Sequence, residues 1–160
     1  MSDSSDSDLP PEVEWGDWGK PVRVRIDPGP VALFARAVKD ETAYSSDGAV
    51  PVPPTFTFVM AHAGAFPDLQ AGGVVPSMYP EGGLGLDRKG LFLHGEQHFT
   101  YHRPVVVGDE LVGRRRVSKP IARTARRGPM EITYFQTRWS DLDGTPVVDE
   151  QIVSLFFPAG

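Results

Sequence analysis

Four histidines are the residues of this chain best suited to acid–base or metal chemistry, and three of them recur at intervals of four residues. His94, His98 and His102 would share one face of a strand over residues 94–102, because side chains alternate across a sheet. Three imidazoles on one face could bind a metal ion or supply a general base. A solvated or interface strand face would hold the same residues without a chemical role. The spacing predicts a shared face and is compatible with either role.

The fourth histidine, His62, lies inside an apolar segment over residues 55–66. Buried polar side chains are normally hydrogen bonded, which favours a structural core histidine over a catalyst at this position. The chain has no cysteine, so a disulfide framework and a thiol nucleophile are excluded.

The composition is typical of one globular domain, since 160 residues with 40% hydrophobic and 23% charged side chains are enough for a single core. The net charge of −5 argues against general nucleic-acid binding. The acidic N-terminus has no apolar core after it, and the longest apolar runs are too short to span a bilayer. We therefore expect a cytoplasmic protein with neither a membrane nor a nucleic acid as partner.

The first part of the chain predicts a tail followed by a strand and a helix. Residues 1–19 are expected to be disordered or irregular, and residues 20–160 to form the domain. Alternating apolar and basic residues at 22–26 indicate a half-buried strand. Asp27 can cap a helix that begins at Pro28 and whose apolar positions recur as far as Val38.

The central part predicts a buried helix between two loops. Residues 45–54 form a loop by composition, and residues 55–66 are apolar on nearly all sides, which is typical of a helix enclosed in a domain. Residues 67–90, rich in Gly and Pro, are expected to be a long irregular loop.

The last part predicts antiparallel strands over residues 94–102, 110–122, 130–140 and 146–157. The first of these would place Gln97, Phe99 and Tyr101 on one face and Glu96, His98 and Thr100 on the other. The order of elements predicts an α+β fold in which an antiparallel sheet wraps around the apolar helix.

Three segments give the chain a family resemblance, namely PPTF at residues 53–56, LHGEQHFTYHRP at residues 93–104 and VGDEL at residues 107–111. Together they resemble the N-terminal, FAS1-like dehydratase domain of the MaoC-like (R)-specific enoyl-thioester hydratases and dehydratases. The similarity covers roughly residues 20–157. It implies a single hot-dog domain, with a curved antiparallel sheet around a long central helix, and acyl thioesters of coenzyme A or acyl carrier protein as substrates.

Catalytic members of this family resemble one another in a G-D-x-N-P-x-H motif, whose Asp and His activate water for addition to a 2-enoyl thioester. In this chain Asp40 matches the Asp, whereas Ser45 stands at the position of the His. A serine hydroxyl cannot act as a general acid–base near neutral pH. Asp40 is therefore either the remnant of a catalytic pair or an ordinary carboxylate at a helix end.

The resemblance also places the thioester carbonyl near the start of the buried helix, where a backbone N–H would polarise it. Pro53 and Pro54 have no N–H, so Thr55 or Phe56 would be the donor. Phe56, Val59 and Met60 would line the acyl cleft. The short crossing from residue 45 to residue 53 implies a cleft more open than in catalytic relatives.

Seven of the sixteen Lys and Arg residues fall between Arg114 and Arg127, where they would either form a solvated hairpin or meet coenzyme A phosphates or an acidic carrier protein.

The resemblance implies the non-catalytic, substrate-binding half of a two-part hydratase or dehydratase, a hydro-lyase that needs no cofactor and no metal. Its catalytic hot-dog partner would be a separate polypeptide, and a homodimer or heterodimer is expected. A pure acyl-thioester binding protein and a hot-dog thioesterase are the alternatives. The thioesterase is the weaker of these, because only Asp40 could serve its chemistry.

Overall fold

The computed structural model describes residues 10, 12–41, 50–61 and 88–159. In chain order the elements are β1 (Val22–Arg25), α1 (Pro28–Val38), α2 (Phe56–Ala61), β2 (Gly90–Tyr101), β3 (Glu110–Val117), β4 (Ile121–Ala125), β5 (Gly128–Ser140) and β6 (Pro146–Pro158). The predicted buried helix over residues 55–66 corresponds to α2, and residues 62–66 of that prediction lie outside the described residues.

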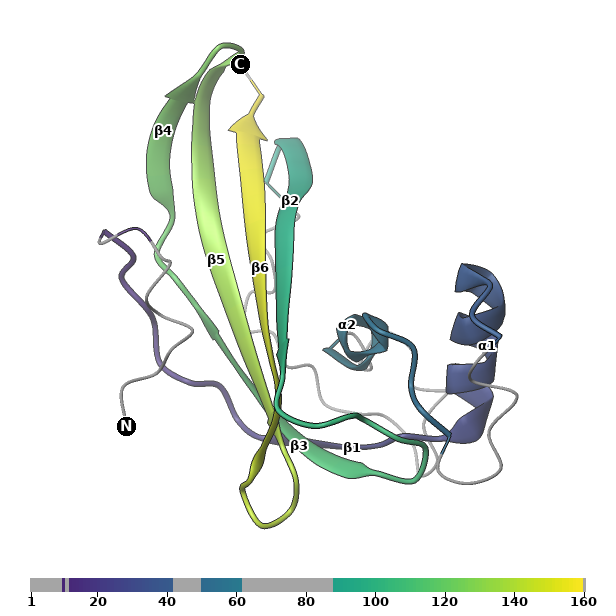
Figure 1. The fold of residues 1–160 in the computed structure, drawn as a ribbon. Coiled ribbons are helices and arrows are strands. Elements are labelled where there is room, and N and C mark those ends of the chain that lie inside the picture. Colours follow the sequence, from purple (N-terminus) through teal and green to yellow (C-terminus); the bar gives the residue numbers. More distant parts are fainter. Residues whose placement is uncertain (1–9, 11, 42–49, 62–87, 160) are drawn as a thin grey trace.

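The strands form one antiparallel sheet in the order β1-β3-β5-β6-β2, with β4 paired to β5 beside this path. Both helices lie on the same side of the long strands, and α2 lies between α1 and β2 (Figure 1). The predicted α+β arrangement, a sheet with the apolar helix against it, is therefore confirmed.

We call the side of the sheet that faces the helices the inner face. Directly paired residues lie on the same face of the sheet. Val24 therefore lies beside Leu111, and Trp139 lies beside Val148. These four pack in one buried cluster with Phe56 of α2. The hydrophobic core therefore lies between the inner face and the helices.

Helix α1 has the predicted bounds, but its expected side-chain cap is absent. Asp27 occupies the N-cap position without a side-chain hydrogen bond to the helix. Pro30 stands at the third helical position and has no N–H to offer, which removes one of the usual donors to a cap. The Asp27 carboxylate instead lies 3.4 Å from Arg25 Nε.

The predicted strand over residues 110–122 is in fact two strands, β3 and β4. The break falls at residues 118–120, where Pro120 has no N–H for a ladder. Ser118 still donates its N–H to Tyr134 O at 2.9 Å, but Lys119 donates to Glu14 O, outside the sheet, at 2.8 Å. The proline and this outward bond together end β3.

Residues 12–19, here called the N-terminal arm, run along the edge of β3. Gly16 donates its N–H to Val117 O at 2.9 Å, and Gly19 donates to Arg115 O at 2.8 Å. Ion pairs join Glu14 to Lys119 and Glu12 to Arg123, so two cations of the predicted basic segment are engaged within the chain. The arm covers part of the sheet edge, and the domain boundary at residue 20 stays a prediction.

A row of polar residues crosses the inner face within the apolar core. Arg115, Thr137 and Glu150 are direct neighbours on β3, β5 and β6, and Arg115 and Glu150 are only 2% and 1% exposed. Arg115 Nε donates to Thr137 Oγ1 at 2.8 Å, and Gln97 Nε2 donates to Glu150 Oε1 at 2.7 Å. Burial raises the pKa of Glu150, against the opposing effects of the Arg115 charge and the Gln97 hydrogen bond.

We predict that Glu150→Gln alters the pH dependence of stability. Because the folded state raises the pKa of Glu150 above its ordinary value of 4.5, the native protein binds this proton more tightly than the unfolded chain. The stability of the wild type minus that of the variant should therefore fall as the pH rises from 4.5 through the raised pKa. Urea denaturation at a series of pH values measures this difference.

Glu131→Gln provides a control of opposite sign, because the hydrogen bond from Arg88 lowers the pKa of Glu131. The stability of the wild type minus that of Glu131→Gln should fall as the pH decreases below 4.5. A Glu150 difference that is flat or that rises with pH would contradict the prediction.

Candidate active site

The predicted site lies where α2 meets β2 on the inner face. The Thr55 N–H, just before α2, donates to the Tyr101 hydroxyl at 3.3 Å. Further along, the Phe58 ring meets the His94 ring edge-to-face with the centroids 5.6 Å apart. On its other side α2 contacts α1 through Phe34 and Phe56, whose centroids are 5.5 Å apart. The start of the helix is thus positioned by one tyrosine of β2 and by the neighbouring helix.

Thr55 has an unusual backbone, with φ at 73° in the left-handed region. A β-branched residue rarely adopts this conformation, and such strain costs about 1–3 kcal/mol and is often found at functional sites. Thr55 is also exposed.

The two expected carbonyl donors both have acceptors within the chain. The Phe56 N–H donates to Pro53 O at 3.1 Å, and the Phe56 side chain is 4% exposed in the core. The Thr55 N–H makes the longer contact with Tyr101, described above. A substrate carbonyl at this point would have to replace the Tyr101 hydroxyl.

Asp40 follows the left-handed residue Lys39 that ends α1, and its N–H donates to Ala35 O at 2.9 Å. Its side chain is half-buried. The other residues of the predicted site cannot be placed beside it: Ser45 and His62, and the side chains of Val59 and Met60, lie outside the described residues. The structure therefore places Thr55 and Phe56 at the start of α2, and the predicted pairing of Asp40 with residue 45 stays untested.

The predicted shared face of the three histidines is wrong, because a β-bulge interrupts β2. His94 pairs with Ser154, whereas Glu96 pairs with Val153, so Gly95 is an extra residue. The bulge leaves His94 on the inner face against α2. His98 and His102 lie on the opposite, outer face, where His102 Nε2 is 2.9 Å from Asp149 Oδ2.

The rest of the predicted β2 alternation is confirmed, with Gln97, Phe99 and Tyr101 on the inner face. Among the described residues no group of three or more His, Asp or Glu side chains is arranged to hold a metal ion. Neither α1 nor α2, the helices of the described chain, has the length or apolar character of a membrane-spanning segment.

Comparison with known proteins identifies the family. A model of the FAS1-like dehydratase domain region matches residues 14–150. A UPF0336 protein of Parafrankia sp. (strain EAN1pec) is 45% identical over 53 residues, which are 33% of this chain and 33% of that protein. The match therefore spans about a third of the curated relative.

Solved structures of similar fold include two complexes from Mycobacterium tuberculosis. The chain aligns with HadBC, described as a (3R)-hydroxyacyl-ACP dehydratase complex, with TM-score 0.63 and 21% identity over 92% of this chain and 99% of that chain. For the ChsH1–ChsH2 complex the TM-score is 0.65 with 19% identity, over 89% of this chain and 86% of that chain. An (R)-hydratase of A. caviae involved in PHA biosynthesis aligns with TM-score 0.51 and 18% identity, over 91% of this chain and 98% of that chain.

The structural alignments confirm the predicted hot-dog fold. Because the family model covers residues 14–150, most of the sequence, this chain belongs to the FAS1-like dehydratase domain family of MaoC-like hot-dog proteins.

Proposed function

We propose that this chain is the substrate-binding half of a heteromeric (R)-specific 2-enoyl thioester hydratase or 3-hydroxyacyl thioester dehydratase. Its partner is a second hot-dog polypeptide that carries the Asp and His of the hydratase motif. This chain holds the acyl group of a coenzyme A or acyl-carrier-protein thioester, and the partner moves the protons. The reaction needs no metal and no redox cofactor.

The replacement of the motif His by Ser45 carries this proposal. Hydration requires one group to deprotonate water and another to deliver a proton at C2, a task that imidazole performs near neutral pH and a hydroxyl does not. Asp40 alone supplies one of the two groups. A chain of this family that retains Asp40 without a basic partner is suited to binding more than to catalysis.

The backbone at α2 agrees with a binding role. Catalysis of thioester chemistry benefits from free, preorganised N–H donors aimed at the developing oxyanion. Here the Phe56 N–H is used by Pro53 O, and the Thr55 N–H is shared with the Tyr101 hydroxyl. The carbonyl of a thioester bound by this chain would meet donors that already have acceptors.

Pairing with another subunit is supported by the sheet and by the relatives. Strand β2 is terminal in the sheet order, and within the described residues its outer edge has no paired strand. Such an edge favours association with another chain. HadBC and ChsH1–ChsH2, two of the similar structures, are described as complexes.

We predict that the purified chain alone hydrates crotonyl-CoA at well below about 1 per second, the low end of ordinary enzymic rates. Mixing it with a hot-dog chain that carries the full motif should restore turnover. In that complex, replacing the partner's motif Asp should reduce the rate about 100-fold or more, as expected for loss of a general acid–base. Asp40→Asn in this chain should have little effect.

Two results would contradict this assignment of roles. One is ordinary turnover by the lone chain. The other is a complex whose rate depends on Asp40 as strongly as on the partner's motif. Acyl-CoA hydrolysis, detected as free thiol, would favour the thioesterase alternative.

We predict that the chain associates through the outer edge of β2. Leu93, 40% exposed on this strand, is a suitable probe, because a charge placed on an edge strand opposes edge-to-edge pairing. Leu93→Lys should shift sedimentation at micromolar concentration from dimer toward monomer. Leu142→Lys, at a residue 54% exposed in the β5–β6 hairpin, should not. A wild-type protein that stays monomeric with and without a candidate partner would refute the prediction.

We predict that binding favours long or bulky acyl groups, because the crossing from residue 45 to residue 53 is short and leaves the cleft beside α2 open. Each buried methylene should contribute roughly 0.8 kcal/mol, or about fourfold in affinity, until the cleft ends. Calorimetric titration with acyl-CoA ligands of increasing chain length, and with a steroid-bearing acyl-CoA, measures the trend. Affinity that is flat, or that is best for the four-carbon ligand, would show that residues 45–53 form an ordinary loop.

A further inference from the structure

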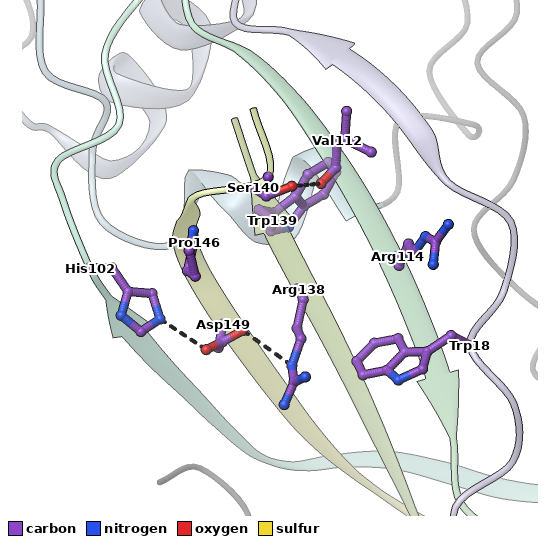
Figure 2. A pocket seen from close by; sticks show the side chains of 10 residues that line it. Trp18, His102, Val112, Arg114, Arg138, Trp139, Ser140, Pro146 and Asp149 are labelled. Atoms are coloured by element: carbon purple, nitrogen blue, oxygen red, sulfur yellow. Dashed lines mark hydrogen bonds and ion pairs between the residues drawn. The ribbon is translucent and has the colours of Figure 1, made fainter. Parts of the chain in front are cut away.

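The outer face of the sheet contains a pocket that is separate from the predicted site. Its volume is about 430 Å³, within the usual range for small-molecule sites. Figure 2 shows Arg138 in the middle, with His102 and Asp149 on one side and Trp18 and Arg114 on the other. Neither Asp40 nor the residues expected to line the acyl cleft border this pocket, although Arg114 belongs to the basic segment that was expected either to be solvated or to meet phosphates.

Two arginines are placed side by side on this face. Arg114 of β3 and Arg138 of β5 are directly paired across the strands, so their side chains leave the sheet as neighbours. Like charges in directly opposite positions destabilise a sheet. The register of β3 against β5 therefore maintains a local excess of positive charge.

The neighbouring acid, Asp149, forms an ion pair with only one of the two arginines, Arg138. Asp149 is paired with Arg138 across β5 and β6, with 3.7 Å between Arg138 Nε and Asp149 Oδ1. The other oxygen of Asp149 is engaged by His102 at 2.9 Å. Among the residues that the structure describes, no carboxylate forms an ion pair with Arg114, which is exposed.

Apolar side chains and Ser140 contribute to the remaining wall. Trp18, brought in by the N-terminal arm, lies with its ring centroid 5.0 Å from the Arg138 guanidinium carbon, and Val112 and Pro146 add aliphatic surface. A pocket with an excess of guanidinium charge, an aromatic ring and aliphatic walls is suited to a ligand with one anionic group and a compact apolar body.

We propose that this pocket binds a small organic anion, whose phosphate or carboxylate group is held by Arg114 and Arg138 while its apolar part lies against Trp18. The site is distinct from the acyl-thioester site and does not depend on the function proposed above. Without a ligand, repulsion between Arg114 and Arg138 destabilises the folded protein, and a bound anion relieves this repulsion.

The test compares Arg114→Gln with Arg127→Gln, a matched loss of charge at an exposed arginine in the β4–β5 turn. Calorimetric titration at low ionic strength uses adenosine monophosphate, adenosine, inorganic phosphate and benzoate. We expect a charged organic probe to bind the wild type, and Arg114→Gln to weaken it about tenfold or more, the usual effect of losing a charge-assisted hydrogen bond. Tightest binding by adenosine monophosphate identifies a phosphate ligand, and tightest binding by benzoate identifies a carboxylate.

Thermal unfolding gives a second, independent readout. Without ligand, Arg114→Gln should melt at a higher temperature than the wild type, because the repulsion is removed, whereas Arg127→Gln should not. At one probe concentration, the melting temperature of the wild type should rise by more than that of Arg114→Gln. The proposal is overturned if uncharged adenosine binds as well as the tightest-binding anion, if no anion binds, or if Arg114→Gln leaves anion affinity unchanged.

Discussion

A carboxylate removed from water must be held by other polar groups, and Glu150 imposes this requirement on four strands at once. Gln97 of β2 donates a hydrogen bond to one of its oxygens, and Arg115 of β3, which is itself held by Thr137 of β5, lies 4.0 Å from the other. A slip of one residue in any of these strands would move its member of the row to the outer face. Loss of one partner from a buried ion pair typically costs about 3–5 kcal/mol, a large part of the stability of a domain. The register that this row stabilises also sets which residues meet on the outer face.

Local patterns in the sequence predicted most of the elements. Pro28 and the recurrence of apolar residues gave both ends of α1, and the alternation around Phe99 gave the two faces of most of β2. Three features were not predicted, although each has a local sign in the sequence. The bulge at Gly95 depends on how β2 meets β6, although a glycine inside a strand is a known sign of one. The break before β4 was signalled by Pro120, and the missing cap at Asp27 by Pro30.

The candidate site was less predictable than the fold, because its contacts join residues far apart in the chain. The resemblance placed the carbonyl donor at the start of the buried helix, and the two prolines without N–H groups left Thr55 or Phe56, but the partner of Thr55, Tyr101, is 46 residues away. The outer-face pocket was not predicted, although the basic segment that begins at Arg114 was expected either to be solvated or to meet phosphates. Arg114 and Arg138 are far apart in the sequence, and only the β3–β5 register makes them neighbours. Trp18 falls in a segment that the sequence assigned to an irregular tail.

The strand order also constrains how this sheet can be assembled. Strand β6 follows every other strand of the sheet in the sequence, yet it lies inside the sheet, between β5 and β2. During synthesis β4 and β5 can form a hairpin early, and β1 can pair with β3, but β2 has no neighbour within the sheet until β6 has emerged. Strand β2 is therefore the last part of the sheet to be fixed. The edge that we assign to partner binding becomes a formed surface only when the sheet is complete, which separates folding of the chain from its assembly.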